Sequence, residues 1–355
     1  IPCGSGSFKK VWIAIDNHAT NEQDKIVVWS DIKIPKKRIN QFRLSNEIKV
    51  MDKIKSTNDA NSNKIYNLIG LLGYWYDKTS DKLVMVTEYA GKGSLGYLIE
   101  TTRVSKKIMS NTNVTKILFH VLKALLFLHT LNLIHRDIKP DNMVITNKDV
   151  VKLIDFGLTT KPLDDGVKLT RQQSVTSDFN PGEFSTTGTP EYMAPEIWSG
   201  REFASYNEKV DIYSVGWVLY SMLSLEPPFI GMVPEQITTV AGMSIYQSIT
   251  YRNYKEQDTG IILDRELSKI AYCQEVNKTC TSSSNIPSNA IPDMEYINTL
   301  FINDREPNPF PNQELNYLDF LKDCILSPDS RLSAEELLIK YFKYSVTPQD
   351  PFSPD

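Results

Sequence analysis

The chain has 355 residues, of which 41% are apolar and 23% are charged, and its 39 basic and 43 acidic residues give a net charge of −4. This composition is typical of a globular protein with a sizeable core, and the length suggests two domains or one large unit with two lobes. Without a basic excess, nucleic acid and anionic membrane surfaces are not expected as partners.

The longest apolar stretch predicts a buried helix rather than a membrane span. It covers residues 117–134 and is interrupted by His120, Lys123 and His129, which the core of a bilayer disfavours. No charged-then-apolar leader is seen at the start of the chain. The cysteines without C-x-x-C spacing are Cys3, Cys273, Cys280 and Cys324. Scattered free thiols indicate a reducing compartment, so we expect a protein of the cytoplasm, with the nucleus as the alternative.

Residues 1–90 predict a small lobe made mostly of strands. A glycine turn divides residues 1–15 into two strands, and a helix is expected at residues 39–54, where apolar residues recur on one face. The further strands are expected at residues 26–34, 68–76 and 83–88.

Residues 91–345 predict a larger lobe made mostly of helices, and residues 346–355 form a tail. The helices are expected at residues 95–100, 114–131, 210–223, 317–325 and 334–341. Polar stretches near residues 161–187 and 255–311 predict two long insertions, of which the second is rich in Ser, Asn and Pro.

The run HRDIKPDNMVITNKDVVKLIDFG, at residues 135–157, carries the strongest chemical signal. Asp137 heads a loop and could orient a hydroxyl nucleophile, while Asn142 and Asp155 offer the oxygen ligands that magnesium prefers. Phosphoryl transfer needs these parts and little covalent chemistry from the protein. The alternative, a surface aspartate in a turn, leaves the spacing of Asn142 and Asp155 unexplained.

This run resembles the catalytic loop and the metal loop of the eukaryotic protein kinases. The resemblance implies an α+β fold with a β-rich N-lobe and a helical C-lobe, with ATP and Mg²⁺ as cofactors. Lys139, in D-I-K-P, would neutralise the transferring phosphate and is typical of members that act on serine and threonine of protein substrates. His135 is expected to pack in the core, not to act as a base.

The resemblance also implies a nucleotide site between the lobes. Glycines at the first turn would let backbone amides approach the phosphates, and backbone groups after the strand at 83–88 would contact adenine. The residues implied are Gly4, Gly6, Val11, Thr87, Glu88, Ala90 and Val144.

Structural roles follow for the segment that would dock the peptide substrate, G-T-P-E-Y-M-A-P-E, which contains Thr189. Glu196 would form a buried ion pair with Arg331, a partnership that suits the forked guanidinium. Asp211 would anchor the backbone of the catalytic loop, and Phe156, followed by Gly157, would pack beneath the helix that bears Glu47.

A regulatory role is implied for the loop before this segment. A phosphate there could pair with Arg136 and order the loop, which would make an upstream kinase or a regulatory protein a partner. The candidate hydroxyls are Ser185, Thr186 and Thr187. The alternative is that they are solvated loop residues without such a role.

One position departs from the usual pattern. The third strand reads V-V-W-S, so Ser30 stands where a lysine that holds the phosphates and pairs with a helix glutamate is usual. Lys9, in G-S-G-S-F-K, replaces the third glycine of the loop, and this combination resembles the with-no-lysine kinases, in which the catalytic lysine lies on the glycine-loop strand. Lys33 is the alternative, although period-two alternation places it on the other face. The chain also departs from that family at Phe156, where leucine is usual.

Two rival functions stay open at this point. A pseudokinase scaffold is favoured by Ser30 but has no need of Asp137, Asn142 and Asp155. A small-molecule kinase has no need of the peptide-docking segment.

Overall fold

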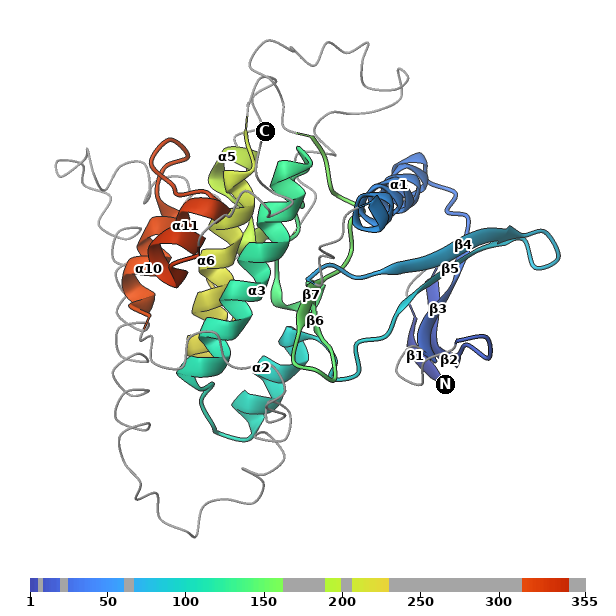
Figure 1. Cartoon of the computed structure of the whole chain (residues 1–355), viewed down its shortest axis with the longest axis horizontal. Coiled ribbons are helices and arrows are strands. Elements are labelled where there is room, and N and C mark those ends of the chain that lie inside the picture. The colour runs from blue at the N-terminus through green and yellow to red at the C-terminus, as the bar shows by residue number, and fades with distance from the viewer. Residues whose placement is uncertain are drawn as a thin grey trace, which may run out of the picture.

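We describe a computed structural model of the chain, covering residues 1–5, 9–19, 25–60, 67–161, 189–198, 206–229 and 315–344. Its two parts are a five-stranded antiparallel sheet with one long helix and a group of helices around a central helix (Figure 1). A two-stranded ladder lies between these parts. The predicted two-lobed α+β architecture is confirmed.

The sheet of the N-terminal part has the strand order β1-β2-β3-β5-β4. Every neighbouring pair is antiparallel, and β2 faces β3 with Lys9 opposite Ile32 and Val11 opposite Ser30. The strands are β1 (Pro2–Ser5), β2 (Lys9–Ile15), β3 (Ile26–Lys33), β4 (Leu71–Asp77) and β5 (Lys82–Glu88). Because side chains alternate along a strand, Lys9, Val11, Ser30 and Ile32 share one face of the sheet.

Helix α1 (Arg38–Ala60) packs against this sheet and is longer than the sequence predicted. The apolar periodicity stops at Ile54, but the chain stays helical because the polar residues that follow bind helix carbonyls. Ser56 and Thr57 donate to the carbonyl of Lys53. Lys53, just before Ile54, also reaches outside the helix, since its Nζ donates to Leu131 O at 2.9 Å.

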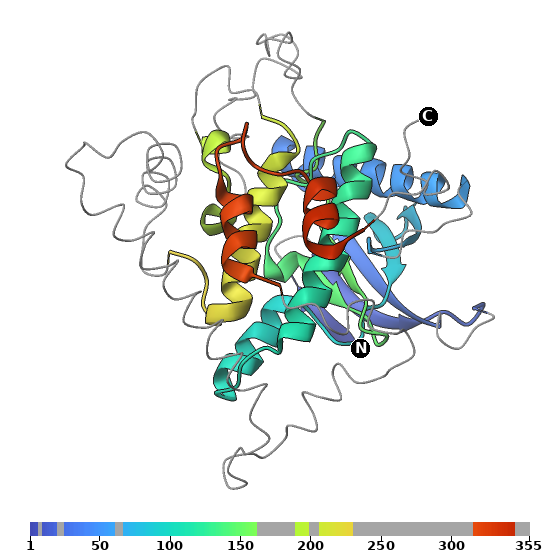
Figure 2. The ribbon, with the colours of Figure 1, turned by 60° about the vertical axis from the view of Figure 1, so that its left-hand side comes forward.

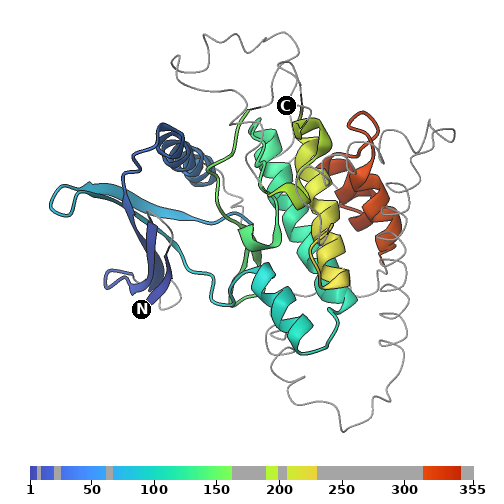
Figure 3. The same cartoon turned by 180° about the vertical axis from the view of Figure 1, so that it is seen from behind.

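The C-terminal part is arranged around α6 (Lys209–Ser224), whose residues from Val210 to Leu223 are all buried. In Figure 2, α10 (Tyr317–Ile325) packs on α6, and α11 (Ala334–Phe342) packs on α3 (Asn111–Thr130). Seen from behind, in Figure 3, α2 (Leu95–Val104) lies near the β6–β7 ladder. The short α5 (Pro195–Trp198) precedes α6 in the chain.

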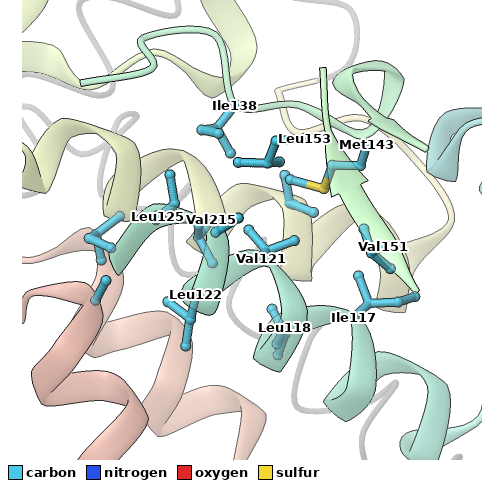
Figure 4. Packing of buried hydrophobic residues seen from close by; sticks show 14 of the residues in the cluster. Ile117, Leu118, Val121, Leu122, Leu125, Ile138, Met143, Val151, Leu153 and Val215 are labelled. Atoms are coloured by element: carbon cyan, nitrogen blue, oxygen red, sulfur yellow. The ribbon is translucent and has the colours of Figure 1, made fainter. Parts of the chain in front are cut away.

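The core of this part is built around α3, which is buried on most of its surface. Figure 4 shows Val121 and Leu125 beside Val215 of α6, and Ile117 beside Val151 of the two-stranded ladder. The ladder β6 (Met143–Ile145) and β7 (Val151–Leu153) packs on the same helix. Because Ile138 is buried in this core, the loop that carries Asp137 is attached to α3 and α6.

Residues 67–69, just before β4, bind the C-terminal part. The sequence predicted a strand from Leu68, but the strand begins at Leu71, because Leu68 forms a parallel bridge with Leu153 of the ladder. Ile69 N donates to Leu153 O at 3.0 Å, and Leu153 N donates to Asn67 O at 2.9 Å. Backbone groups that the prediction assigned to the sheet therefore bind the C-terminal part.

Among the described residues, no helix is both long and apolar enough to span a bilayer, which agrees with the reading of residues 117–134 as a buried helix.

Candidate active site

Asp137 lies at the centre of a compact polar network and is 8% exposed. Its Oδ2 accepts hydrogen bonds from Lys139 Nζ at 2.8 Å and from Asn142 Nδ2 at 2.7 Å. Asn142 Nδ2 also donates to the backbone oxygen of Asp137 at 2.9 Å. Thr189 Oγ1 lies 3.3 Å from the other carboxylate oxygen and accepts from Lys139 Nζ at 2.8 Å. Four residues that the sequence singled out therefore meet at one carboxylate.

Asp211, which is fully buried on α6, holds the backbone of this loop. Its carboxylate accepts from the amides of His135 and Arg136 at 2.9 and 2.8 Å and from His129 Nε2 at 2.9 Å. Burial favours the neutral acid, but the hydrogen bond from His129, the charges of His129 and His135 and the amide of Arg136 prevail and lower the pKa of Asp211. The predicted anchoring contact is present, and it fixes a loop in which Arg136 has a φ of 68°.

Asn142 and Asp155 lie close together because Ile154 N donates to Asn142 O at 3.0 Å. The amide nitrogen of Asn142 serves Asp137, which leaves its side-chain oxygen for a cation. Asp155 is exposed and has a φ of 65°, and its Oδ1 accepts from Gly157 N at 3.4 Å. Two hard oxygen donors at the edge of a loop fit Mg²⁺, which takes one or two protein ligands and completes its shell with phosphate and water.

The strand face opposite this loop carries the basic residue of the site. Lys9 Nζ lies 3.9 Å from Glu47 Oε1 of α1, with side chains 34% and 16% exposed. Burial raises the pKa of Glu47, while Lys9 lowers it and Asp155 raises it further. Ser30 is buried beside Val11 on the same sheet face, and Lys33 is exposed at the end of β3. The structure thus brings Lys9, and not Lys33, to the predicted helix glutamate.

The predicted adenine-contacting residues lie where β5 leaves the sheet. Glu88 N donates to Gly70 O at 3.0 Å, and the Glu88 carboxylate accepts from Gly70 N at 2.5 Å and from Lys152 Nζ at 2.7 Å. Ala90 follows Glu88, and Val144 of β6 is half-buried. The glycine turn lies on the other side, where Gly4 is opposite Val11 in the sheet register.

The predicted pair of Glu196 and Arg331 is present. Arg331 Nη1 and Nη2 bind the two oxygens of Glu196 at 2.5 and 3.3 Å, and the Arg331 side chain is fully buried. The remaining donors of Arg331 reach Leu326 O at 3.0 Å and Lys209 O at 2.9 Å. This network connects α5 to the loop between α10 and α11.

Other predicted residues also have definite surroundings. Phe156 is fully buried, with its ring centroid 5.4 Å from that of His135, and Gly157 is buried beside it. The guanidinium of Arg136 lies over the ring of Tyr206 at 5.4 Å. The predicted residues outside the described part of the chain are Gly6, Ser185, Thr186 and Thr187.

Sequence reasoning missed three residues that position this site: Asn46, His129 and Lys152. His129 was taken only as an interruption of an apolar helix, although a polar residue on a buried helix face signals a partner such as Asp211. Lys152 is 7% exposed and stands between apolar residues of a strand. A charged residue at such a position likewise indicates a buried partner. No local pattern marks Asn46, which is half-buried on α1.

Comparison with known proteins agrees with this geometry. A family model described as "Protein kinase domain" matches residues 2–342. The probable serine/threonine-protein kinase nek2 of Dictyostelium discoideum is 29% identical over 250 residues, which are 69% of this chain and 52% of that protein. Serine/threonine-protein kinase CLA4 of Eremothecium gossypii is 33% identical over 227 residues, 62% of this chain and 25% of that protein. The chain therefore spans only about half or less of the length of these relatives.

A solved structure shares the fold. A chain from the CAK complex of Chaetomium thermophilum, bound to ATP-γ-S, superposes with a TM-score of 0.63 at 20% identity, covering 98% of this chain and 92% of that one.

Proposed function

We propose that this chain, which belongs to the protein kinase domain family, transfers the γ-phosphoryl group of ATP to serine and threonine hydroxyls of proteins. Its fold is the two-lobed α+β protein kinase fold. The observation that carries the proposal is the meeting of Lys139, Asn142 and Thr189 at the Asp137 carboxylate. The relatives named as serine/threonine kinases support the choice of acceptor.

Each residue of this network has a distinct task in the proposed reaction. Asp137 orients the acceptor hydroxyl and accepts its hydrogen bond, because its position is fixed from both sides by Lys139 and Asn142. Lys139, shared between Asp137 and Thr189, supplies a positive charge beside the group that is transferred. Asn142 and Asp155 would hold Mg²⁺, which when bound offsets negative charge on the nucleotide phosphates.

We assign the phosphate-anchoring lysine to Lys9. It shares a sheet face with Ser30, it lies beside Glu47, and neighbouring strands are only about 4.8 Å apart, so its four-carbon side chain reaches the oxygens that a lysine at position 30 would reach. Lys33 ends β3 with its side chain exposed, three residues after Ser30 and therefore on the other face of the sheet. The arrangement is the one that similarity to the with-no-lysine kinases implies.

A second candidate function, a pseudokinase scaffold, is favoured by one observation. Ser30 is buried and cannot supply the charge that the third strand usually provides. Against it stands the well-ordered set of Asp137, Asn142 and Asp155, which a scaffold would not require.

Phosphate transfer to a peptide array, with magnesium and ATP, tests both functions. We expect turnover by the native chain, a loss of about 100-fold in Lys9→Met, and near-native activity in Lys33→Met. Lys10→Met is the matched control, since Lys10 is the exposed neighbour of Lys9 on the same strand. Full activity in Lys9→Met would show that the anchoring lysine lies elsewhere. ATP binding by the native chain, seen as a thermal shift without turnover, would favour the scaffold.

The substrate class and compartment follow from the same proposal. We propose that the acceptors are proteins, with an upstream kinase or a regulatory protein as a further partner, and that the chain acts in the cytoplasm or nucleus. The buried free thiol of Cys324 is compatible with a reducing compartment.

A further inference from the structure

One side-chain amide of α1 binds three backbone carbonyls of the metal loop. Asn46 Nδ2 lies 2.7 Å from Thr159 O, 3.3 Å from Phe156 O and 3.4 Å from Gly157 O. The nitrogen must face these oxygens, because carbonyls accept and only the amide nitrogen has hydrogens to donate. The Asn46 side chain thus binds the turn that follows Asp155, which also has a backbone hydrogen bond from Thr159 N to Phe156 O at 3.1 Å.

The turn needs such support, because its backbone is not in a relaxed conformation. Asp155 has a φ of 65°, in the left-handed region that non-glycine residues seldom adopt. Helix α1 also runs close to the turn, since a Cβ added to Gly157 would come into van der Waals contact with Arg43 Cβ at 3.7 Å and Arg43 O at 3.8 Å. The position of α1 and the conformation of residues 155–159 are therefore tied together.

The residue after Asn46 is Glu47, which points to the other half of the site. Consecutive helix residues point about 100° apart, so one turn of α1 faces Lys9 through Glu47 and the metal loop through Asn46. A displacement of this turn would break both sets of contacts at once.

We propose that Asn46 is a positioning residue that couples the placement of α1 to the orientation of Asp155, so that the phosphate lysine and the metal ligand are assembled together. Asn46 touches neither substrate nor metal in this scheme. It acts by holding the carbonyls of residues 156–159, which fixes the direction of the Asp155 carboxylate. The inference rests on the proposed kinase activity for its enzymatic consequence, but the coupling itself is a property of the nucleotide-free protein.

Hydrogen–deuterium exchange of the nucleotide-free chain tests the coupling without any activity. We expect Asn46→Ala to increase exchange of the amides in residues 155–160 by about tenfold, because the contacts of the amide are lost. Asn46→Asp, of the same size but without a donor, should increase it at least as much, since its carboxylate would face three carbonyl oxygens. Ser45→Ala, at the exposed neighbouring position, should leave it unchanged. Native exchange in Asn46→Asp would overturn the proposal.

A double substitution tests the link to the other half of the site. Glu47→Gln, which releases α1 from Lys9, should increase exchange of residues 155–160 in the native background and add little in Asn46→Ala, because the hydrogen bonds that transmit a shift of α1 to these carbonyls are those of Asn46. Fully additive effects would show that the two contacts are independent and would overturn the proposed coupling.

The enzymatic arm is a magnesium titration of phosphate transfer at saturating ATP. We expect Asn46→Ala to need about tenfold more Mg²⁺ for half-maximal rate, with a smaller change in kcat, since Asp155 is misdirected but not removed. An unchanged magnesium requirement together with native exchange would overturn the inference. Absence of turnover in the native chain would contradict the proposed function instead, and the exchange arms would still decide on the coupling.

Discussion

The two halves of the site are built in different ways. The catalytic loop is fixed by short hydrogen bonds: Asp137 receives two of 2.7–2.8 Å, and buried Asp211 receives three of 2.8–2.9 Å. The half that we assign to phosphate anchoring depends on one pair, Lys9 and Glu47, at 3.9 Å with the lysine 34% exposed. The groups that we propose to orient the hydroxyl are thus fixed before a substrate binds. Lys9, which we propose to bind phosphate, can change its position.

The physical chemistry of the residues explains this contrast. Buried acceptors need their donors, so a loop held by Asp211 has one stable arrangement. Glu47 is partly buried, and this burial raises its pKa while Lys9 alone lowers it, so the pair is poorly compensated. At 3.9 Å the pair is longer than a hydrogen bond, so the flexible side chain of Lys9 can turn from Glu47 to a phosphate without breaking one.

The largest expected effect concerns the preorganised half. Asp137→Asn should lower kcat by about 10²–10⁴-fold, because the amide can no longer accept the hydroxyl proton, while the KM for ATP stays nearly native. Steady-state kinetics on a phosphorylatable peptide measure both values. A native kcat would mean that the network around Asp137 has another purpose.

The next effect concerns the framework beneath that half. Glu196→Ala leaves the buried Arg331 without its carboxylate and should lower the free energy of unfolding by about 3–5 kcal/mol in urea denaturation. Glu100→Ala removes a carboxylate from an exposed pair with Arg103 and serves as the control, with no change expected. Equal effects of the two substitutions would contradict the ranking by burial.

A third prediction uses the lowered pKa of Asp211. Its contribution to stability is fully present above its ordinary value of 3.8 and is lost as the pH falls through the folded pKa. Asp211→Asn should lower the free energy of unfolding by about 1–3 kcal/mol at about pH 5, since buried donors lose their acceptor, and by less at about pH 3. Urea denaturation of both proteins at the two pH values measures this. A difference that grows on acidification would contradict it.

The smallest expected effect is on the stability of the adjustable half. Glu47→Gln should change the free energy of unfolding by less than about 0.5 kcal/mol, because a poorly compensated charge is removed together with a long ion pair. The same substitution should raise the KM for ATP, because Lys9 loses the carboxylate that orients its side chain. A strongly destabilised Glu47→Gln protein would show that the Lys9–Glu47 pair is as firmly held as the network around Asp137.

The sequence predicted the parts of the site that are fixed by spacing within one segment or by a family pattern. The offsets from Asp137 to Asn142 and Asp155 placed these residues together, and the resemblance paired Glu196 with Arg331 across 135 positions. The strands were also recognisable, since alternation along β3 correctly separated Ser30 from Lys33.

The parts that could not be predicted depend on contacts between distant segments. Asn46 binds carbonyls 110–113 positions away. Every residue has a backbone carbonyl, so the sequence does not indicate which donor it will bind. The last turns of α1 and the departure of Leu68 from β4 have the same origin, since local hydrogen bonds and a distant strand overrode the apolar pattern.

The pair formed by Glu88 and Lys152 has a mechanical consequence. Glu88 stands at the end of β5, where the chain crosses from one lobe to the other, and its carboxylate is tied to Lys152 of the C-terminal part and to the amide of Gly70. Hydrogen bonds that lie on the axis of a rotation hardly change length when the lobes rotate, but they would lengthen if the lobes slid past each other. We therefore expect the two lobes to rotate about this point and not to slide past each other, so that the distance from Lys9 to Asp155 changes while the contacts of Glu88 persist.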